Sequence, residues 1–318
     1  MRRALLWLLI VPVGLAVVAV LALTDGLTGD DGSSEAASNR RSGKASSSSS
    51  SSTAPRSTTT TTSGAETALT AARQPESPAD LAAAIGRSEN AIRASGADTP
   101  DLARWARAQQ LAYRQLAHRP EWDAEVQRLL DPSLRGVVTA NVEAHRRLWS
   151  LTDPKPDLPE WRIVAPPPPG ELLAHYRAAE AEFGVPWQYL AGIHLVETRM
   201  GRIRGVSSAG AQGPMQFMPA TWAAYGEGDV DDPADAIRAA SRYLAAHGAP
   251  GDIDRALFAY NHSDHYVEAV KAHAGVMADD EAAYYGYYHW DVYYRLQSGD
   301  VLLPVGWTRA DGHPGGAS

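Results

Sequence analysis

Residues 185–201, VPWQYLAGIHLVETRMG, combine the pattern of a buried helix with one misplaced acid. Pro186 suits the first turn of a helix, and Gly201 suits its C-terminal end. Spacings of three and four place on one helical face Leu190, Ile193, Glu197 and Met200. Glu197 is therefore a carboxyl group on the stripe that is expected to be buried.

Two effects are expected to keep Glu197 protonated. Desolvation disfavours a carboxylate, and so does the partial negative charge of the nearby helix C-terminus. Together they would raise the pKa of a glutamate from about 4.3 to about 6–7. General-acid cleavage of a glycosidic bond requires such a protonated carboxyl group. The alternative is a glutamate at the rim that pairs with Arg199 or Arg202.

Two further segments carry groups suited to binding a sugar. In the first, Gly210 and Gly213 permit tight backbone turns, and Gln216 offers both donors and acceptors to sugar hydroxyl and acetamido groups. In the second, Tyr260 and Asn261 end a predicted helix and supply a phenol and an amide. Both segments follow Glu197 along the chain.

These segments carry a resemblance to a known family. Glu197-Thr198, Gly213-Pro-Met-Gln216 and Ala259-Tyr-Asn261 resemble, in order, the three motifs of lytic transglycosylases with a lysozyme-like (SLT) domain. The element Asp232-Pro-Ala-Asp-Ala-Ile237 and the tetrapeptide Tyr260-Asn-His-Ser263 look like the membrane-bound B-type branch and its actinobacterial relatives. The resemblance covers about residues 170–275. Thr198 and Pro214 depart from the usual serine and leucine, which affects orientation more than reaction class.

The resemblance implies cleavage of the MurNAc-β-1,4-GlcNAc bond of peptidoglycan without water, in cell-wall remodelling. Glu197 would protonate the leaving oxygen and then act as base on the C6 hydroxyl, which attacks C1 to form 1,6-anhydroMurNAc. Tyr260 would hydrogen-bond Glu197. The implied substrate-binding residues are Thr198, Gly213, Met215, Gln216, Tyr260 and Asn261. No cofactor is implied.

Two other functions remain open. A hydrolytic muramidase would use water and usually a second carboxylate. The available acids, none at a diagnostic spacing, are Asp229, Asp231, Asp232 and Asp235. A non-catalytic peptidoglycan-binding or scaffold protein would suit a long tether, but it has no need of the complete set of motif residues.

The N-terminal segment determines the expected location. Arg2 and Arg3 precede an uncharged apolar run over residues 4–23, long enough to cross a bilayer with the N-terminus inside. Residues 1–24 are therefore expected to be a single-pass anchor in the cell membrane, with the catalytic domain extracytoplasmic. The alternative is a cleaved signal and a secreted protein.

The rest of the chain divides by composition. Residues 25–78, rich in Ser and Thr, are expected to be a disordered linker. Residues 79–152 read as a helical preface, such as a hairpin used as spacer or docking pair, and 153–170 as a Pro-rich connector. Residues 171–318 are expected to form a mainly α, lysozyme-like domain with a short β-hairpin over Tyr284–Leu296 and Val301–Leu303. The tyrosines of that hairpin could pack inside or form a groove wall.

The composition limits the classes of partner and ligand expected for this chain. The 318 residues carry a formal net charge of −8, which argues against nucleic acid as a partner. Without cysteine, thiolate metal sites and thiol nucleophiles are excluded. His262, Asp264 and His265 lack a recognised metal pattern, and residues 227–232 lack the glycine and glutamate of a calcium loop. The expected partners are peptidoglycan glycan strands and, through the N-terminal helix, a membrane; protein partners are not indicated.

Overall fold

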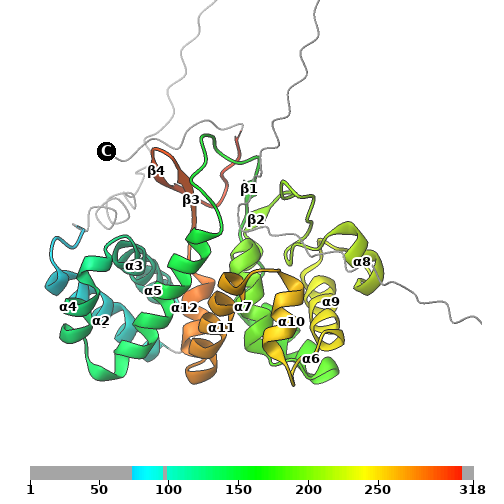
Figure 1. Cartoon of the computed structure of the whole chain (residues 1–318), viewed down its shortest axis with the longest axis horizontal. Coiled ribbons are helices and arrows are strands. Elements are labelled where there is room, and N and C mark those ends of the chain that lie inside the picture. Colours follow the sequence, from blue (N-terminus) through cyan, green and yellow to red (C-terminus); the bar gives the residue numbers. More distant parts are fainter. Residues whose placement is uncertain (1–73, 96–98, 310–318) are drawn as a thin grey trace, which may run out of the picture. The chain divides into compact units, whose positions relative to one another are not determined.

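The computed structural model describes residues 74–95 and 99–309, which are mainly helical (Figure 1). Within these ranges the first four helices are α2 (Pro78–Ser95), α3 (Pro100–Ala117), α4 (Asp123–Leu129) and α5 (Arg135–Ser150). The later helices are α6 (Pro169–Phe183), α7 (Trp187–Thr198), α8 (Pro219–Tyr225), α9 (Pro233–Ala246), α10 (Ile253–Tyr260), α11 (Asp264–Asp279) and α12 (Ala282–Tyr288). The strands are β1 (Arg162–Ile163), β2 (Ile203–Arg204), β3 (Val292–Leu296) and β4 (Gly299–Leu303). The prediction of a mainly α fold with a C-terminal β-hairpin is confirmed.

The predicted anchor and most of the predicted Ser/Thr-rich linker lie outside the described residues. Among the helices that are described, none has the length and apolar character needed to cross a membrane. The described residues from Pro75 onward belong to one compact unit.

Helix α7 lies at the centre of the lysozyme-like part, with α6, α9 and α11 packed against it. Local sequence sets where these helices begin and end. Helix α6 ends at Gly184, whose φ of 74° favours glycine. Helix α9 begins after Asp232, whose carboxylate accepts hydrogen bonds from the backbone amides of Ala234 and Asp235. The core side chains of α7 are thus held between helices with defined ends.

Helices α2–α5 share a hydrophobic core with the lysozyme-like part, where a hairpin or docking pair was predicted. Helix α5 packs along α11, and α12 contacts both α2 and α3. Buried polar contacts reinforce this packing: Tyr287 donates to Asn141 Oδ1 at 2.7 Å, and Trp290 Nε1 donates to Gln109 Oε1 at 3.0 Å. One buried cluster includes apolar residues from both parts, so the connector does not separate two cores.

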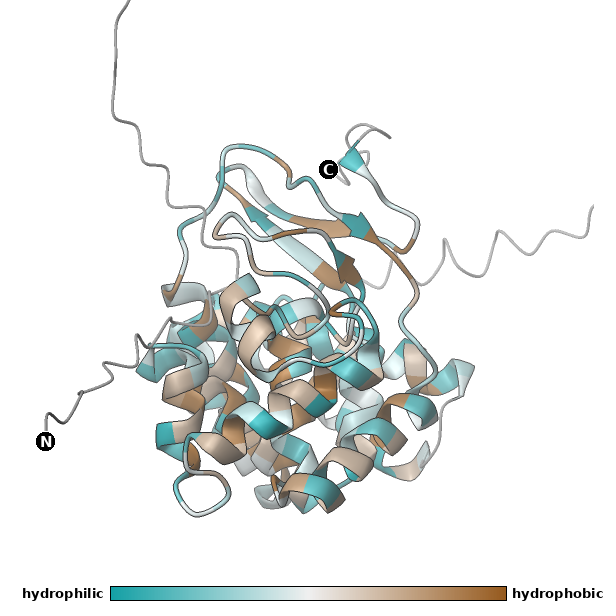
Figure 2. Ribbon diagram, turned by 90° about the vertical axis from the view of Figure 1, so that its right-hand side faces the viewer, coloured by the Kyte–Doolittle hydropathy of each residue, from teal (hydrophilic) through white to brown (hydrophobic). Residues whose placement is uncertain are grey.

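A second, smaller core lies among the strands. Strands β1 and β2 pair with each other and β3 pairs with β4, both antiparallel. Figure 1 shows both pairs on the same side of the helices, and Figure 2 shows hydrophobic segments on the strands as well as among the helices. The buried residues of this core are Ile163, Val292, Tyr294, Leu296, Leu303 and Trp307. Connector, β2 loop and hairpin are therefore packed together.

The strand predicted from Tyr284 begins later than expected. Residues Ala282–Tyr288 form helix α12, and β3 starts only at Val292. The tyrosines pack inward, because Tyr284 donates to the carbonyl of Pro169 at 2.7 Å and Tyr288 donates to that of Pro167 at 3.1 Å. Tertiary packing has overridden the β-propensity of the aromatic run.

Candidate active site

Glu197 occupies the last turn of α7 and is buried as predicted, with 3% of its surface exposed. The chain then turns through three consecutive residues with positive φ: Arg199 at 54°, Met200 at 59° and Gly201 at 83°. The first two are strained for residues that carry a side chain. The amides of Arg199 and Met200 donate to the carbonyls of Leu195 and His194. These bonds hold the turn and fix the position of Glu197 at the end of α7.

The hydroxyl of Tyr266 donates to Glu197 Oε1 at 2.8 Å. Burial raises the pKa of Tyr266 well above its usual value of 10, and the charge of Glu197 raises it further. The phenol therefore stays protonated and remains a donor. Tyr260 was expected to make this contact, but its hydroxyl donates to the carbonyl of Met215 at 2.7 Å. Burial raises the pKa of Tyr260 well above its usual value, and the charge of Glu197 raises it further.

Sequence reasoning missed Tyr266. It lies on α11, near the helix N-terminus and five residues beyond the third motif. It reaches the acid only through tertiary packing of α11 against α7. Its position soon after Asn261 was the only available signal.

Thr198 is fully buried and links the first motif to the second. Its hydroxyl donates to the carbonyl of Pro214 at 2.6 Å and accepts from the amide of Gly201 at 3.1 Å. With no exposed surface, Thr198 orients the backbone on both sides and does not itself present a group to a ligand.

The second motif is a tight turn whose shape depends on Gly213. Its φ is 72°, and a Cβ at this position would lie 2.0 Å from the carbonyl oxygen of Val230. The turn closes on Gln216, which has a φ of 53° and whose Nε2 donates to the Gly213 carbonyl at 2.8 Å. The Met215 side chain is fully buried, so the backbone carbonyl bound by Tyr260 is its notable group here. A strained, self-bonded turn thus fixes the amide of Gln216.

The third motif brings Asn261 to the C-terminus of α10. Asn261 is 3% exposed, and its Nδ2 has no hydrogen-bond partner among the described residues. A buried amide donor without a partner is costly unless a ligand or water accepts from it. Asn261 is therefore suited to hold an acceptor such as an acetamido carbonyl.

A cavity of about 340 Å³ contains both Glu197 and Gln216. Its other walls come from the connector, including Asp157, Glu160 and Trp161, from the segment 203–208 that includes β2, and from Tyr294 and Arg309. Tyr260 and Asn261 are not among the residues that line it. Its volume lies near the lower end of the range of about 300–1,000 Å³ usual for ligand sites. The structure thus brings the acid and the glutamine together in one accessible space.

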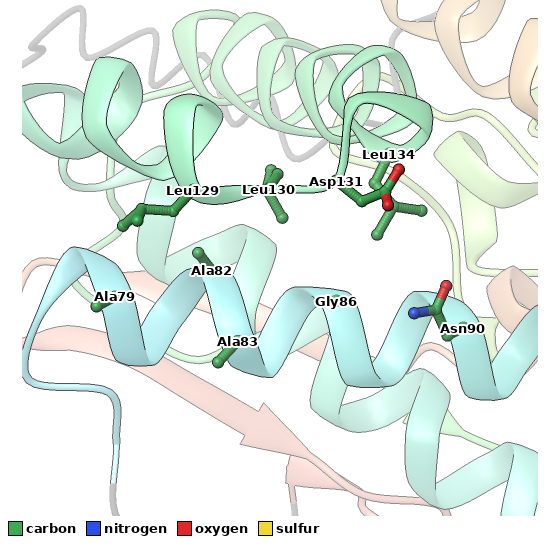
Figure 3. Close-up of a pocket in the computed structure, with 9 residues that line it drawn as sticks. All are labelled: Ala79, Ala82, Ala83, Gly86, Asn90, Leu129, Leu130, Asp131 and Leu134. Atoms are coloured by element: carbon green, nitrogen blue, oxygen red, sulfur yellow. The ribbon is translucent and has the colours of Figure 1, made fainter.

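A second cavity, of about 250 Å³, lies between α2 and the turn that follows α4 (Figure 3). Its lining is mostly alanine and leucine, and its one acidic residue is Asp131. Asp131 accepts hydrogen bonds from the amide and hydroxyl of Ser133, at 2.8 and 2.6 Å, which commits it to the local turn. This cavity has no acid suited to catalysis.

The acids considered for hydrolysis organise a loop and do not line the Glu197 cavity. Asp229 accepts from the amide of Asp231 at 2.9 Å, and Asp235 accepts from the amide of Asp229 at 2.9 Å. Within residues 74–95 and 99–309, no group of three His, Asp or Glu side chains is placed to hold a metal ion.

Arg199 and Arg202 were the alternative partners considered for Glu197. The Cζ atom of Arg202 lies 5.1 Å from the centre of the Tyr288 ring, and the Cζ atom of Arg199 lies 5.9 Å from the centre of the Trp290 ring.

Part of the chain that contains this site matches a known family. Residues 175–282 match the family model described as Transglycosylase SLT domain, over about a third of the 318 residues. The match includes Glu197, Gln216, Asn261 and Tyr266. Searches of curated proteins and of solved structures each found no match.

Proposed function

We propose that this chain, which carries the SLT domain of lytic transglycosylases acting on peptidoglycan, cleaves the MurNAc-β-1,4-GlcNAc bond without water. Glu197 donates its proton to the glycosidic oxygen as the bond to MurNAc C1 breaks. The resulting carboxylate takes the proton of the C6 hydroxyl of the same MurNAc while O6 bonds to C1. The products are a GlcNAc with a free hydroxyl and a 1,6-anhydroMurNAc end, and Glu197 is protonated again.

The burial of Glu197 within a ligand-sized cavity is the observation that supports this proposal best. A carboxyl group with 3% exposure is disfavoured as an anion, which suits it to be a general acid. The Tyr266 hydroxyl at 2.8 Å orients it and stabilises the carboxylate formed after the first proton transfer. The amide of Gln216 in the same cavity supplies donors and acceptors for the sugar.

The test is digestion of purified peptidoglycan, followed by mass analysis of the fragments. Glu197→Gln keeps the shape of the side chain but removes its proton, so cleavage should fall by about 10²–10⁴-fold. Glu268→Gln is the matched control, because Glu268 lies exposed on α11 and pairs with Lys271 at 3.4 Å. Full activity of Glu197→Gln would refute the assignment. An intact chain that binds peptidoglycan but releases no fragments would instead be a binding or scaffold protein.

Hydrolysis is a second candidate, because Asp157 and Glu160 line the same cavity as Glu197. Either carboxylate is exposed to solvent and could activate a water molecule, as the second acid of a muramidase does. Glu160, however, is paired with Arg309 at 2.8 Å. The same digest separates the two reactions, since hydrolysis leaves a reducing MurNAc end and transglycosylation leaves an anhydro end.

We also propose that the enzyme works outside the cytoplasm, held to the membrane by residues 4–23. The support is the apolar run preceded by two arginines. Detergent should be required to release the full chain from the membrane fraction. Release by salt or its presence in the culture medium, at a mass lacking the first residues, would indicate the secreted alternative.

A further inference from the structure

The segment Pro156–Trp161, here called the strap, lies outside the matched domain yet forms part of the Glu197 cavity. Backbone hydrogen bonds fix the chain on both sides of it. Before the strap, the Lys155 amide donates to Arg295 O and the Lys155 carbonyl accepts from Gln297, each at 2.9 Å. After it, the amide of Ile163 donates to Trp307 O at 2.9 Å. The strap is therefore a fixed wall of the cavity.

Trp161 is the largest side chain that the strap contributes. It packs edge-on against Tyr294, with ring centroids 5.3 Å apart at 89°. Gly205 lies close beneath it, because a Cβ at Gly205 would be 3.2 Å from Trp161 Cδ1. Despite these contacts the indole is only half-buried. A rigidly supported aromatic ring is thus left partly open in the cavity of the acid.

Besides the charged side chains of Lys155 and Asp157, the lining offers an apolar surface and polar groups. Val206, 60% exposed, lies in the same cavity as Trp161 and the Gln216 amide. The Glu160 carboxylate pairs with Arg309, which also donates to Leu158 O at 2.8 Å. This pairing neutralises two charges at the strap. Pyranose rings combine apolar C–H faces with polar edges, which matches a cavity lined by both an indole and an amide.

We propose that the strap and Val206 form a saccharide subsite that binds one N-acetylhexosamine ring of the glycan strand against Trp161. The inference rests on the proposed function for its substrate class. It extends the binding site to residues of the connector, which the matched domain does not contain. The subsite would hold the strand while Glu197 acts on the adjoining bond.

The first experiment measures binding of the β-1,4-linked tetramer of N-acetylglucosamine by calorimetry, in the full chain carrying Glu197→Gln. Adding Trp161→Ala should raise Kd about tenfold, whereas Trp161→Phe should keep it within about threefold. Trp122→Ala is the matched control, since Trp122 is a half-buried tryptophan outside the cavity. Unchanged Kd in a folded Trp161→Ala protein would overturn the proposal.

A second pair of variants avoids the packing of Trp161. Val206→Asp places a charge on an exposed cavity residue, and Val305→Asp does so at a valine 57% exposed that lies outside the cavity lining. Val206→Asp should raise both Kd and the KM for peptidoglycan at least fivefold, and Val305→Asp should change neither. Equal behaviour of the two variants would refute the subsite.

Failure of the subsite and failure of the proposed function give different results. If the unmodified chain produces anhydro ends while the Trp161 and Val206 variants keep the Kd and KM of their parent proteins, the subsite is wrong and the function stands. If the chain releases no fragments but the tetramer binds and Trp161→Ala weakens it, the subsite stands and the enzymatic function is wrong.

Discussion

Replacing Tyr266 with phenylalanine removes the hydroxyl that donates to Glu197 Oε1 at 2.8 Å. This bond favours the ionised carboxylate, so its loss should raise the pKa of Glu197. A hydrogen bond to a charged group is worth about 1.5–3 kcal/mol, and one pKa unit corresponds to about 1.4 kcal/mol. The protonated acid also accepts this bond, which is then worth about 0.5–1.5 kcal/mol, so only the difference counts and the expected rise in pKa is about one unit.

The pH dependence of kcat/KM reports this change. A general acid must be protonated in the free enzyme, so activity is lost as the pH rises through its pKa. In Tyr266→Phe the alkaline limb should consequently move upward by about one pH unit. Tyr266 itself does not titrate in this range, because burial raises its own pKa well above 10.

The assay follows release of soluble fragments from peptidoglycan between about pH 4 and pH 9, with initial rates at low substrate. Tyr287→Phe is the matched control, because Tyr287 is equally buried and donates at 2.7 Å to Asn141, away from Glu197. Its limb should stay in place while its stability falls. A limb that stays put or moves downward in Tyr266→Phe would refute the assigned role of the hydroxyl.

Three further outcomes follow from the site and its surroundings. Gly213→Ala should destabilise the fold by at least about 2 kcal/mol and abolish cleavage, because the added Cβ would lie 2.0 Å from Val230 O. A variant with the melting temperature of the parent would contradict this. Thr198→Val should cost about 1–3 kcal/mol and lower kcat, because it removes the hydroxyl that bridges two backbone groups, whereas Thr198→Ser should restore both. Burial lowers the pKa of His194 and His273 to about 3, so the unfolded state binds more protons below about pH 6.5 and stability should fall from there towards pH 3. At pH 5 the loss is about 2 kcal/mol per histidine, and denaturant melts that are flat from pH 7 to pH 5 would disprove it.

The motif-bearing helix was predictable because its information is local. Spacing along residues 185–201 indicated both the helix and the buried position of Glu197, and α7 spans Trp187–Thr198 with Glu197 3% exposed. The tight second motif followed from the conformational freedom of Gly213. Features that depend only on the periodicity and turns of a short stretch of chain could therefore be predicted from the sequence.

The contacts between distant segments were not predictable in this way. Tyr266 meets Glu197 across 69 residues, and the strap is held at the cavity by flanking residues that pair with the hairpin and with Trp307. Nothing in local spacing encodes such pairings. The aromatic run after Ala282 gave the wrong element for the same reason, since packing of α12 on α2 and α3 outweighs local propensity.

The left-handed turn after Glu197 sets a trade-off for anyone who would engineer this protein. Arg199 and Met200 hold positive φ values of 54° and 59°, a conformation that costs a residue with a side chain roughly 1–2 kcal/mol. Glycine in place of Arg199 would relieve that cost and raise the melting temperature, whereas glycine in place of Met200 would also remove a fully buried side chain and destabilise the core. The change at Arg199 would make the end of α7 that positions Glu197 less rigid. A gain in stability would therefore be accompanied by a lower catalytic rate.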